Sequence, residues 1–151
     1  MYKNRYNLIC YNTYGGIDMN KYILDFLKDI MAIDSPSGYS KKVIHYCQKE
    51  AEKLGFQTKK THKGNLEIYV EGQDDYTIGF CGHVDTLGLM VRSIKSDGTL
   101  AFTNVGGPII PTLDGEYCRI HTRDGQCYTG TILSNYPAVH VYKDAKVHKR
   151  L

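Results

Sequence analysis

The hydrophobic period of the chain changes at Gly55, and this change limits the possible folds more than any other feature of the sequence. Before Gly55, apolar residues recur every three or four positions, as they do on one face of an α-helix. After it, apolar and polar residues alternate, which is typical of β-strands. Helices followed by strands indicate a layered α/β fold.

Two helices are expected in the first part of the chain, over residues 20–33 and about 39–54. Asn20 is a candidate N-cap for the first helix, and the sequence "DSPSG" that follows it contains the helix breakers proline and glycine. Gly55 occupies the usual terminal position of the second helix. The expected apolar faces consist of Ile23, Phe26, Leu27, Ile30 and Met31 in the first helix, and of Val43, Ile44, Cys47 and Leu54 in the second.

Several strands are expected after Gly55. "FQTKKTH" and "NLEIYVEG" are predicted to form a hairpin. "YTIGFCGH" (76–83) is more uniformly apolar than these two segments, as in a strand covered on both faces. "SDG" joins two further strands within residues 87–107, and "TRDGQ" indicates another hairpin. The segment after Gly107 is rich in turns and short β runs, so we expect a domain boundary near Gly106–Pro108.

The composition argues against several functional classes. The net charge is only +3 and the basic residues are scattered, so nucleic-acid binding is not expected. No apolar run approaches the roughly 20 residues of a membrane span. The five cysteines are odd in number and form no CxxC pair, and residues 1–18 do not resemble a signal peptide, so we expect a reducing, cytoplasmic location. Residues 1–18 are interpreted as a polar extension that need not be native, with Met19 as a second plausible start.

His83 and Asp85 are the main candidates for chemistry. Residues two apart on a strand point the same way, and ligands of open α/β sheets bind at the carboxyl ends of strands. Imidazole is a common ligand of zinc and cobalt, and a nearby carboxylate often accepts the other ring N–H. The His-x-Asp pattern alone is also compatible with a capped strand end that has no metal.

Four stretches around this pair resemble the N-terminal part of the dinuclear metal aminopeptidases, a family that includes glutamyl aminopeptidase and tetrahedral aminopeptidase, with some members labelled endoglucanases. They are "SPSGYSKKVIHYCQKEAEKLG", "KGNLEIYVEG", "GHVDTLGLMVRSIKSDGTLAFTNVGG" and "TGTILSNYPAVHVY". The resemblance covers roughly residues 20–151. Many members have glutamate after the motif aspartate, where this chain has Thr86; because Thr86 is not an expected ligand, the metal assignment is unaffected.

The resemblance implies a fold, an activity and two site residues. The fold is α/β: residues 19–106 correspond to the N-terminal part of a mixed-sheet catalytic domain, and residues 107–151 to the start of a small inserted β-barrel-like domain used for dimerisation. The implied activity is hydrolysis of N-terminal residues from peptides by water that two divalent ions, zinc or cobalt, activate. His83 corresponds to a metal ligand and Asp85 to the carboxylate that orients it. Dimers of family members build dodecamers, so a homo-oligomer is expected.

The remaining ligands and the general base lie beyond the insert in this family. We therefore expect this chain to be an incomplete piece that is inactive alone. The other potential ligands have no expected role in the site; they are Cys81, His45, His62, Asp114, Glu116, His121 and His140.

Three alternative functions compete with this interpretation. The related carboxypeptidase and deacylase group also has a His-x-Asp motif, but usually continues with a proline-rich turn that this chain lacks. A polysaccharide hydrolase would need two carboxylates roughly 5–10 Å apart, and no pair stands out in the sequence. A truncated, non-catalytic paralogue acting as an assembly module is the alternative that stays open.

Overall fold

The structure is a computed structural model that describes residues 13–14, 17–73 and 75–134. The sequence predictions for residues 1–12 and for residues 135–151, which include His140, lie outside the described residues. The chain divides into two units, Met1–Thr86 and Leu87–Leu151, called here the N-terminal and C-terminal units. The domain boundary near Gly106–Pro108 stays a prediction.

Helix α1 (Met19–Ala32) begins one residue earlier than the sequence indicated. Asp18, and not Asn20, is its N-cap: the Asp18 carboxylate accepts hydrogen bonds from the backbone N–H groups of Asn20 and Lys21 at 3.1 and 3.3 Å. A carboxylate is a good cap because it satisfies free amides and complements the positive end of the helix dipole. The prediction of the helix is confirmed, and that of its cap is wrong by two residues.

Aromatic side chains form the contact between α1 and α2 (Lys41–Lys53). The ring of Phe26 stacks on those of Tyr22 and Tyr46, with centroids 6.2 and 5.8 Å apart, and the Tyr46 hydroxyl donates to Asp29 at 2.7 Å. Only part of the expected apolar face of α1 is covered in this way. Ile23, Leu27 and Met31 remain exposed.

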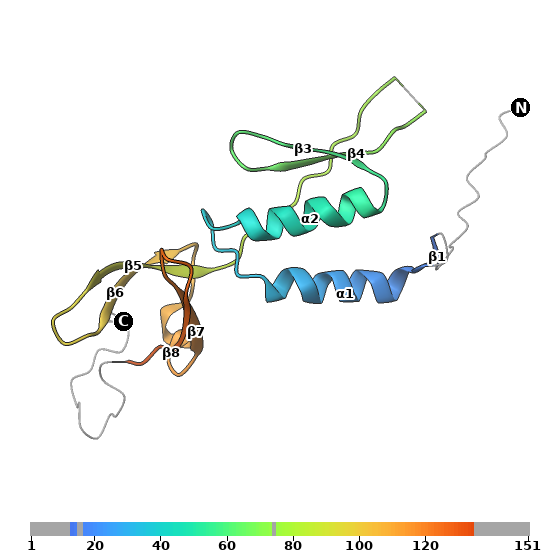
Figure 1. The fold of residues 1–151 in the computed structure, drawn as a ribbon. Helices are drawn as coiled ribbons and strands as arrows, with labels where there is room; N and C mark the ends of the chain where they lie inside the picture. Colours follow the sequence, from blue (N-terminus) through green and yellow to red (C-terminus); the bar gives the residue numbers. More distant parts are fainter. Residues whose placement is uncertain (1–12, 15–16, 74, 135–151) are drawn as a thin grey trace, which may run out of the picture. The chain divides into compact units, whose positions relative to one another are not determined.

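Helix α2 carries the small buried core of the N-terminal unit. It lies between α1 and the hairpin of β3 (Gln57–Lys60) and β4 (Leu66–Tyr69) (Figure 1). Val43 is fully buried and Ala51 nearly so. Gly55 ends the helix with φ +85°, the left-handed conformation that favours glycine. The second predicted helix and the hairpin after it are both confirmed.

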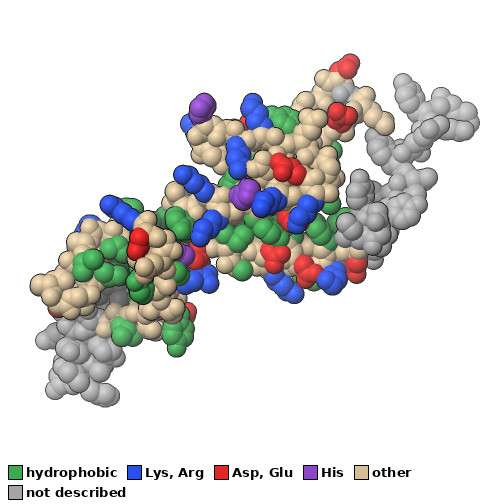
Figure 2. All heavy atoms as spheres, in the orientation of Figure 1, with side chains coloured by type: hydrophobic (Ala, Val, Ile, Leu, Met, Phe, Trp, Pro, Cys, Tyr) green, Lys and Arg blue, Asp and Glu red, His purple; other side chains and the backbone are tan. Residues whose placement is uncertain are grey.

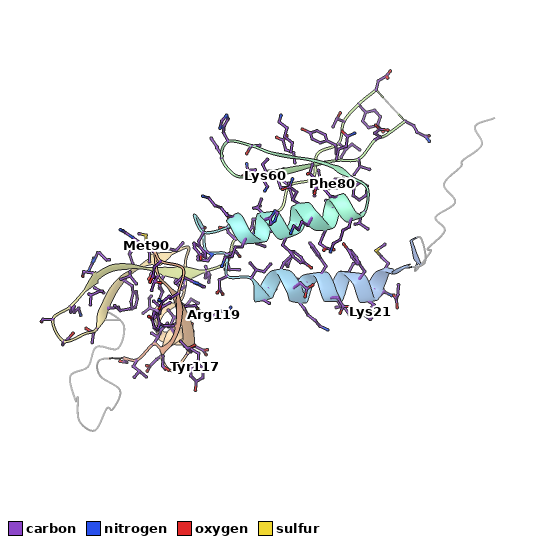
Figure 3. The ribbon with its side chains drawn as sticks, viewed as in Figure 1. Lys21, Lys60, Phe80, Met90, Tyr117 and Arg119 are labelled. Carbon is purple, nitrogen blue, oxygen red and sulfur yellow. The ribbon has the colours of Figure 1, made fainter. Side chains whose placement is uncertain are left out.

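The predicted strand at residues 76–83 is absent from the structure. This segment pairs with no other strand among the described residues, and Tyr76, Ile78 and Phe80 are exposed. Phe80, labelled in Figure 3, is 95% exposed. A strand needs neighbouring backbone to satisfy its N–H and C=O groups, so an apolar sequence alone does not form one.

Two antiparallel hairpins make up the described part of the C-terminal unit. Strand β5 (Gly88–Ile94) pairs with β6 (Leu100–Val105), with an irregularity between Val91 and Ser93. Strand β7 (Tyr117–His121) pairs with β8 (Cys127–Thr131), and a short 3₁₀ helix, η1 (Ile110–Leu113), precedes them. Gly98 and Gly125 adopt positive φ in the two turns, as the "SDG" and "RDG" sequences predicted.

The structure confirms a mixed α/β composition. Every sheet among the described residues has two antiparallel strands, including the short pair β1 (Thr13–Tyr14) and β2 (Ile17–Asp18). A larger mixed sheet and an inserted barrel stay predictions. Apolar side chains are visible on the surface of both units (Figure 2). None of the described helices is both long enough and apolar enough to cross a membrane.

Candidate metal-binding site

His83 and Asp85 are in direct contact in the N-terminal unit. The Nδ1 atom of His83 lies 3.1 Å from Oδ1 of Asp85 and 3.3 Å from the Asp85 backbone carbonyl oxygen. The two residues lie in an irregular segment and not at the end of a strand, because the preceding residues form none. The strand that was expected to place both side chains on one face is missing, and the contact forms without it. The roles of the two residues at a metal ion stay predictions.

This geometry determines which nitrogen of His83 carries the proton. Both neighbours of Nδ1 are oxygen atoms that only accept hydrogen bonds when the carboxyl is ionised. Nδ1 must therefore donate, which leaves the lone pair of the neutral imidazole on Nε2. The side chain of His83 is 86% exposed, so Nε2 is open to a ligand.

The Asp85 carboxylate has a second partner, the Ser37 hydroxyl, which donates to Oδ2. One carboxylate thus joins a serine and a histidine that are far apart in the sequence, using a different oxygen for each. The hydrogen bond from Ser37 lowers the pKa of Asp85 below its ordinary value, and the bond from His83 adds to this effect. The carboxylate is therefore held in its ionised form.

Ser35 holds the backbone on both sides of Asp85 by hydrogen bonds to Val84 and Thr86. It is the buried polar side chain of the described residues, and its hydroxyl donates to the Val84 carbonyl at 2.9 Å. The Thr86 N–H donates to the Ser35 carbonyl at 3.0 Å, and Pro36 and Thr86 form an isolated parallel bridge. Residues 34–38 were expected to break the helix, and neither serine was expected to contact residues 84–86. The available signal was two serines on either side of a proline.

The surroundings of His83 are partly apolar. A cavity of about 660 Å³ adjoins His83 and Asp85, and its other walls include Ile44 and Cys47 of α2 and Leu66 of β4. The imidazole therefore lines a depression in the N-terminal unit.

None of the other candidate ligands shares a hydrogen bond with His83 in the described part of the chain, and His140 lies outside the described residues. Asp114 accepts a hydrogen bond from the Ser134 N–H at 2.7 Å, and Glu116 and His121 lie near or on β7 in the C-terminal unit. Cys81 is an exposed free thiol two residues before His83. Among the residues that the structure describes, no group of three or more His, Cys, Asp or Glu side chains is arranged to hold a metal ion.

The arrangement of His83 suits one ligand position of a metal centre. Metal-binding histidines usually donate their second ring N–H to a carboxylate, which sets the tautomer and raises the basicity of the ligating nitrogen. In His83, Nδ1 makes this contact with Asp85, and the exposed side chain leaves Nε2 available to a metal ion. A sequence model of M42 glutamyl aminopeptidase matches residues 64–151, which is more than half of the chain and includes this pair. The chain belongs to the M42 glutamyl aminopeptidase family.

Relatives in the M42 family extend the match. YhfE of Bacillus subtilis (strain 168), a protein assigned to the aminopeptidases, is 41% identical over 123 residues, which are 81% of this chain and 36% of YhfE. The glutamyl aminopeptidase of Lactococcus lactis subsp. cremoris (strain MG1363) is 27% identical over 106 residues, 69% of this chain and 30% of that protein. The chain thus spans about a third of the length of these relatives.

Two solved peptidase structures have a similar fold over most of this chain. The TET aminopeptidase from the marine sediment archaeon Thaumarchaeota archaeon SCGC AB-539-E09 superposes with a TM-score of 0.74 at 25% identity, over 87% of this chain and 36% of that one. The TET1 peptidase of Pyrococcus horikoshii gives a TM-score of 0.68 at 28% identity, over 83% and 37%. The resemblance predicted from the sequence is confirmed.

Proposed function

We propose that the protein takes part in metal-dependent removal of N-terminal residues from peptides, with His83 as a metal ligand and Asp85 as the group that orients it. The observation that carries this proposal is the His83–Asp85 contact of 3.1 Å, in a chain of the M42 family. This contact leaves the lone pair of Nε2 available to bind a metal ion. The ion is a divalent cation of the zinc or cobalt type, to which imidazole is suited.

The described residues have defined parts in this function. A divalent ion, when bound, supplies polarisation of the scissile carbonyl and of the attacking water. His83 provides one donor atom, and Asp85 keeps the imidazole proton on Nδ1 so that Nε2 stays available. Peptides with a free N-terminus are the proposed substrates.

Catalytic zinc ions usually have three protein ligands. We therefore propose that peptide hydrolysis needs residues additional to these 151, and that the chain alone is inactive. This part of the proposal is supported by the share of its relatives that the chain covers, about a third.

Complementation with a relative tests the proposal. The chain is co-produced with the part of YhfE that the match leaves uncovered, loaded with Zn²⁺ or Co²⁺, and assayed with leucine and glutamate p-nitroanilides. We expect hydrolysis by the pair, none by either part alone, and loss of activity on chelation. His83→Ala should abolish turnover and Asp85→Asn should lower metal affinity or activity by about 10- to 100-fold. His45→Ala, at an exposed position of α2, is the matched control and should have no effect.

The same preparation tests a non-catalytic assembly role. The solved TET1 peptidase of Pyrococcus horikoshii can assemble into a tetrahedron or a large octahedral shell. We propose that this protein also self-associates, which sedimentation velocity would show. A stable complex that lacks activity and metal uptake, and that is unchanged by His83→Ala, would replace the enzymatic proposal by the assembly role.

A further inference from the structure

The Asp85 carboxylate connects two side chains at once. Its Oδ1 accepts from His83 Nδ1 at 3.1 Å, and its Oδ2 accepts from the Ser37 hydroxyl. Because each oxygen has its own donor, rotation of the carboxylate would break both bonds. The orientation of the imidazole is therefore linked to the position of Ser37.

The backbone holds Ser37 at a defined place. The parallel bridge between Pro36 and Thr86 brings the residue before Ser37 next to the residue after Asp85. Buried Ser35 stabilises this contact: its carbonyl accepts from the Thr86 N–H, and its hydroxyl donates to the Val84 carbonyl. A tight turn follows, closed by the Tyr39 N–H donating to the Pro36 carbonyl at 2.7 Å. The hydroxyl of Ser37 is thus supplied by an anchored turn.

The exposure of the pair explains why a second anchor matters. The side chains of His83 and Asp85 are 86% and 40% exposed, so water competes for the hydrogen bond between them. An exposed ion pair or hydrogen bond is weak because holding two side chains in one geometry costs entropy. A hydroxyl that fixes the carboxylate beforehand removes part of that cost.

We propose that Ser37 is a positioning residue for metal binding: its hydroxyl holds the Asp85 carboxylate so that His83 keeps its proton on Nδ1 and presents Nε2. The inference rests on the proposed role of His83 as a metal ligand. It adds a residue from the loop between α1 and α2 to a site that the sequence placed entirely within residues 83–85. Ser37 acts through Asp85 and needs no contact with ion or substrate.

The tautomer of His83 in the metal-free chain gives a direct test. The chain is labelled with ¹⁵N-histidine, and the ring nitrogens are observed by NMR at a pH where imidazoles are neutral; His83→Gln identifies the signals. The main comparison is Ser37→Thr against Ser37→Val, which have the same shape and differ in the hydroxyl. Ser40→Ala is the control, because Ser40 lies in the same loop and its side chain makes no capping hydrogen bond.

We expect Ser37→Thr to keep the Nδ1–H form. Ser37→Val should lower the ratio of the Nδ1–H to the Nε2–H form roughly two- to tenfold, the range for loss of one supporting hydrogen bond. Ser40→Ala should resemble the wild type. Backbone amide spectra show whether each variant is folded, and Ser37→Ala replaces the valine variant if that one is not.

Two outcomes separate this inference from the proposed function. If Asp85→Ala shifts the tautomer and Ser37→Val does not, the His83–Asp85 site stands and the role of Ser37 is refuted. If Asp85→Ala leaves the tautomer unchanged, the Asp85 carboxylate does not orient the ring, because the Asp85 backbone carbonyl near Nδ1 is then sufficient. The proposed role of the Asp85 side chain and the role of Ser37 then both fall, whereas His83 as a metal ligand is tested separately by His83→Ala. Broadening of the His83 signals by added Mn²⁺, weaker in the valine variant than in the threonine variant, would be a second supporting result.

Discussion

Replacing Ser35 by alanine should loosen the attachment of residues 84–86 without touching the proposed ligand. Ser35 is fully buried, and its hydroxyl donates to the Val84 carbonyl at 2.9 Å. Alanine leaves that partly buried carbonyl without its partner. An unsatisfied buried polar group costs about 1–3 kcal/mol. The Thr86 N–H, which donates to the Ser35 carbonyl, reports the loss because it is freed when this attachment opens.

Native-state hydrogen exchange measures the effect at a single amide. A cost of about 1–3 kcal/mol corresponds to roughly 5- to 140-fold faster exchange of the Thr86 N–H, if the amide exchanges through local opening. Ser40→Ala just before α2 should change it by less than about 0.5 kcal/mol, because the Ser40 side chain makes no capping hydrogen bond. Exchange of Thr86 at the wild-type rate in Ser35→Ala would show that the buried hydroxyl does not hold this backbone, and the reasoning would be refuted.

Three further predictions concern other parts of the structure. Gly106→Ala should destabilise the β5–β6 hairpin by about 1–3 kcal/mol, which denaturant melts would measure. Gly106 has φ +79°, and an added Cβ would lie 2.7 Å from Leu87 Cδ2. Hydrogen bonds from the Thr99 backbone N–H and hydroxyl lower the pKa of Asp97 in the folded state. The stability that they give is present above the pKa of the unfolded state and is lost as the pH falls through the pKa of the folded state. Asp97→Asn should therefore reduce the loss of stability at acid pH, as melts at several pH values would show. Burial raises the pKa of the Cys47 thiol, so iodoacetamide should label Cys47 more slowly than exposed Cys81, as peptide mass spectrometry would show.

Each of these has a result that would contradict it. Gly98→Ala is the control for Gly106, since Gly98 also has positive φ but open space around it; equal losses would mean that the contact with Leu87 contributes nothing. An acid limb that survives Asp97→Asn would assign the pH dependence to another carboxyl group. Equal labelling of the native and the urea-unfolded chain at Cys47 would show that this thiol is not protected.

Local elements of the fold could be predicted from the sequence because their causes are local. The period of apolar residues located both helices, and the glycines at positions 98 and 125 located two hairpin turns. The N-cap was misplaced because Asp18 and Asn20 are both good caps, and the sequence does not show which side chain reaches the free amides.

The other errors concern contacts between distant segments. Residues 76–83 were predicted to be a buried strand from their apolar composition, but strand formation depends on partners that a sequence pattern does not specify. The pairing of His83 with Asp85 was accessible because the residues are two apart. Ser35 and Ser37 were missed because their partners lie 49 and 48 residues away.

The link between Ser35 and Val84 also bears on the order of folding. Closing a loop of 49 residues costs about 3 kcal/mol of chain entropy beyond the constant term, and one hydrogen bond does not offset it. Helix α2 and the β3–β4 hairpin lie within that loop and shorten it when they form. The His83–Asp85 contact is local and can form early, whereas its attachment to Ser35 and Ser37 should come after the elements in between. A metal ion that binds only the anchored form would therefore bind late in folding and leave the early steps unchanged.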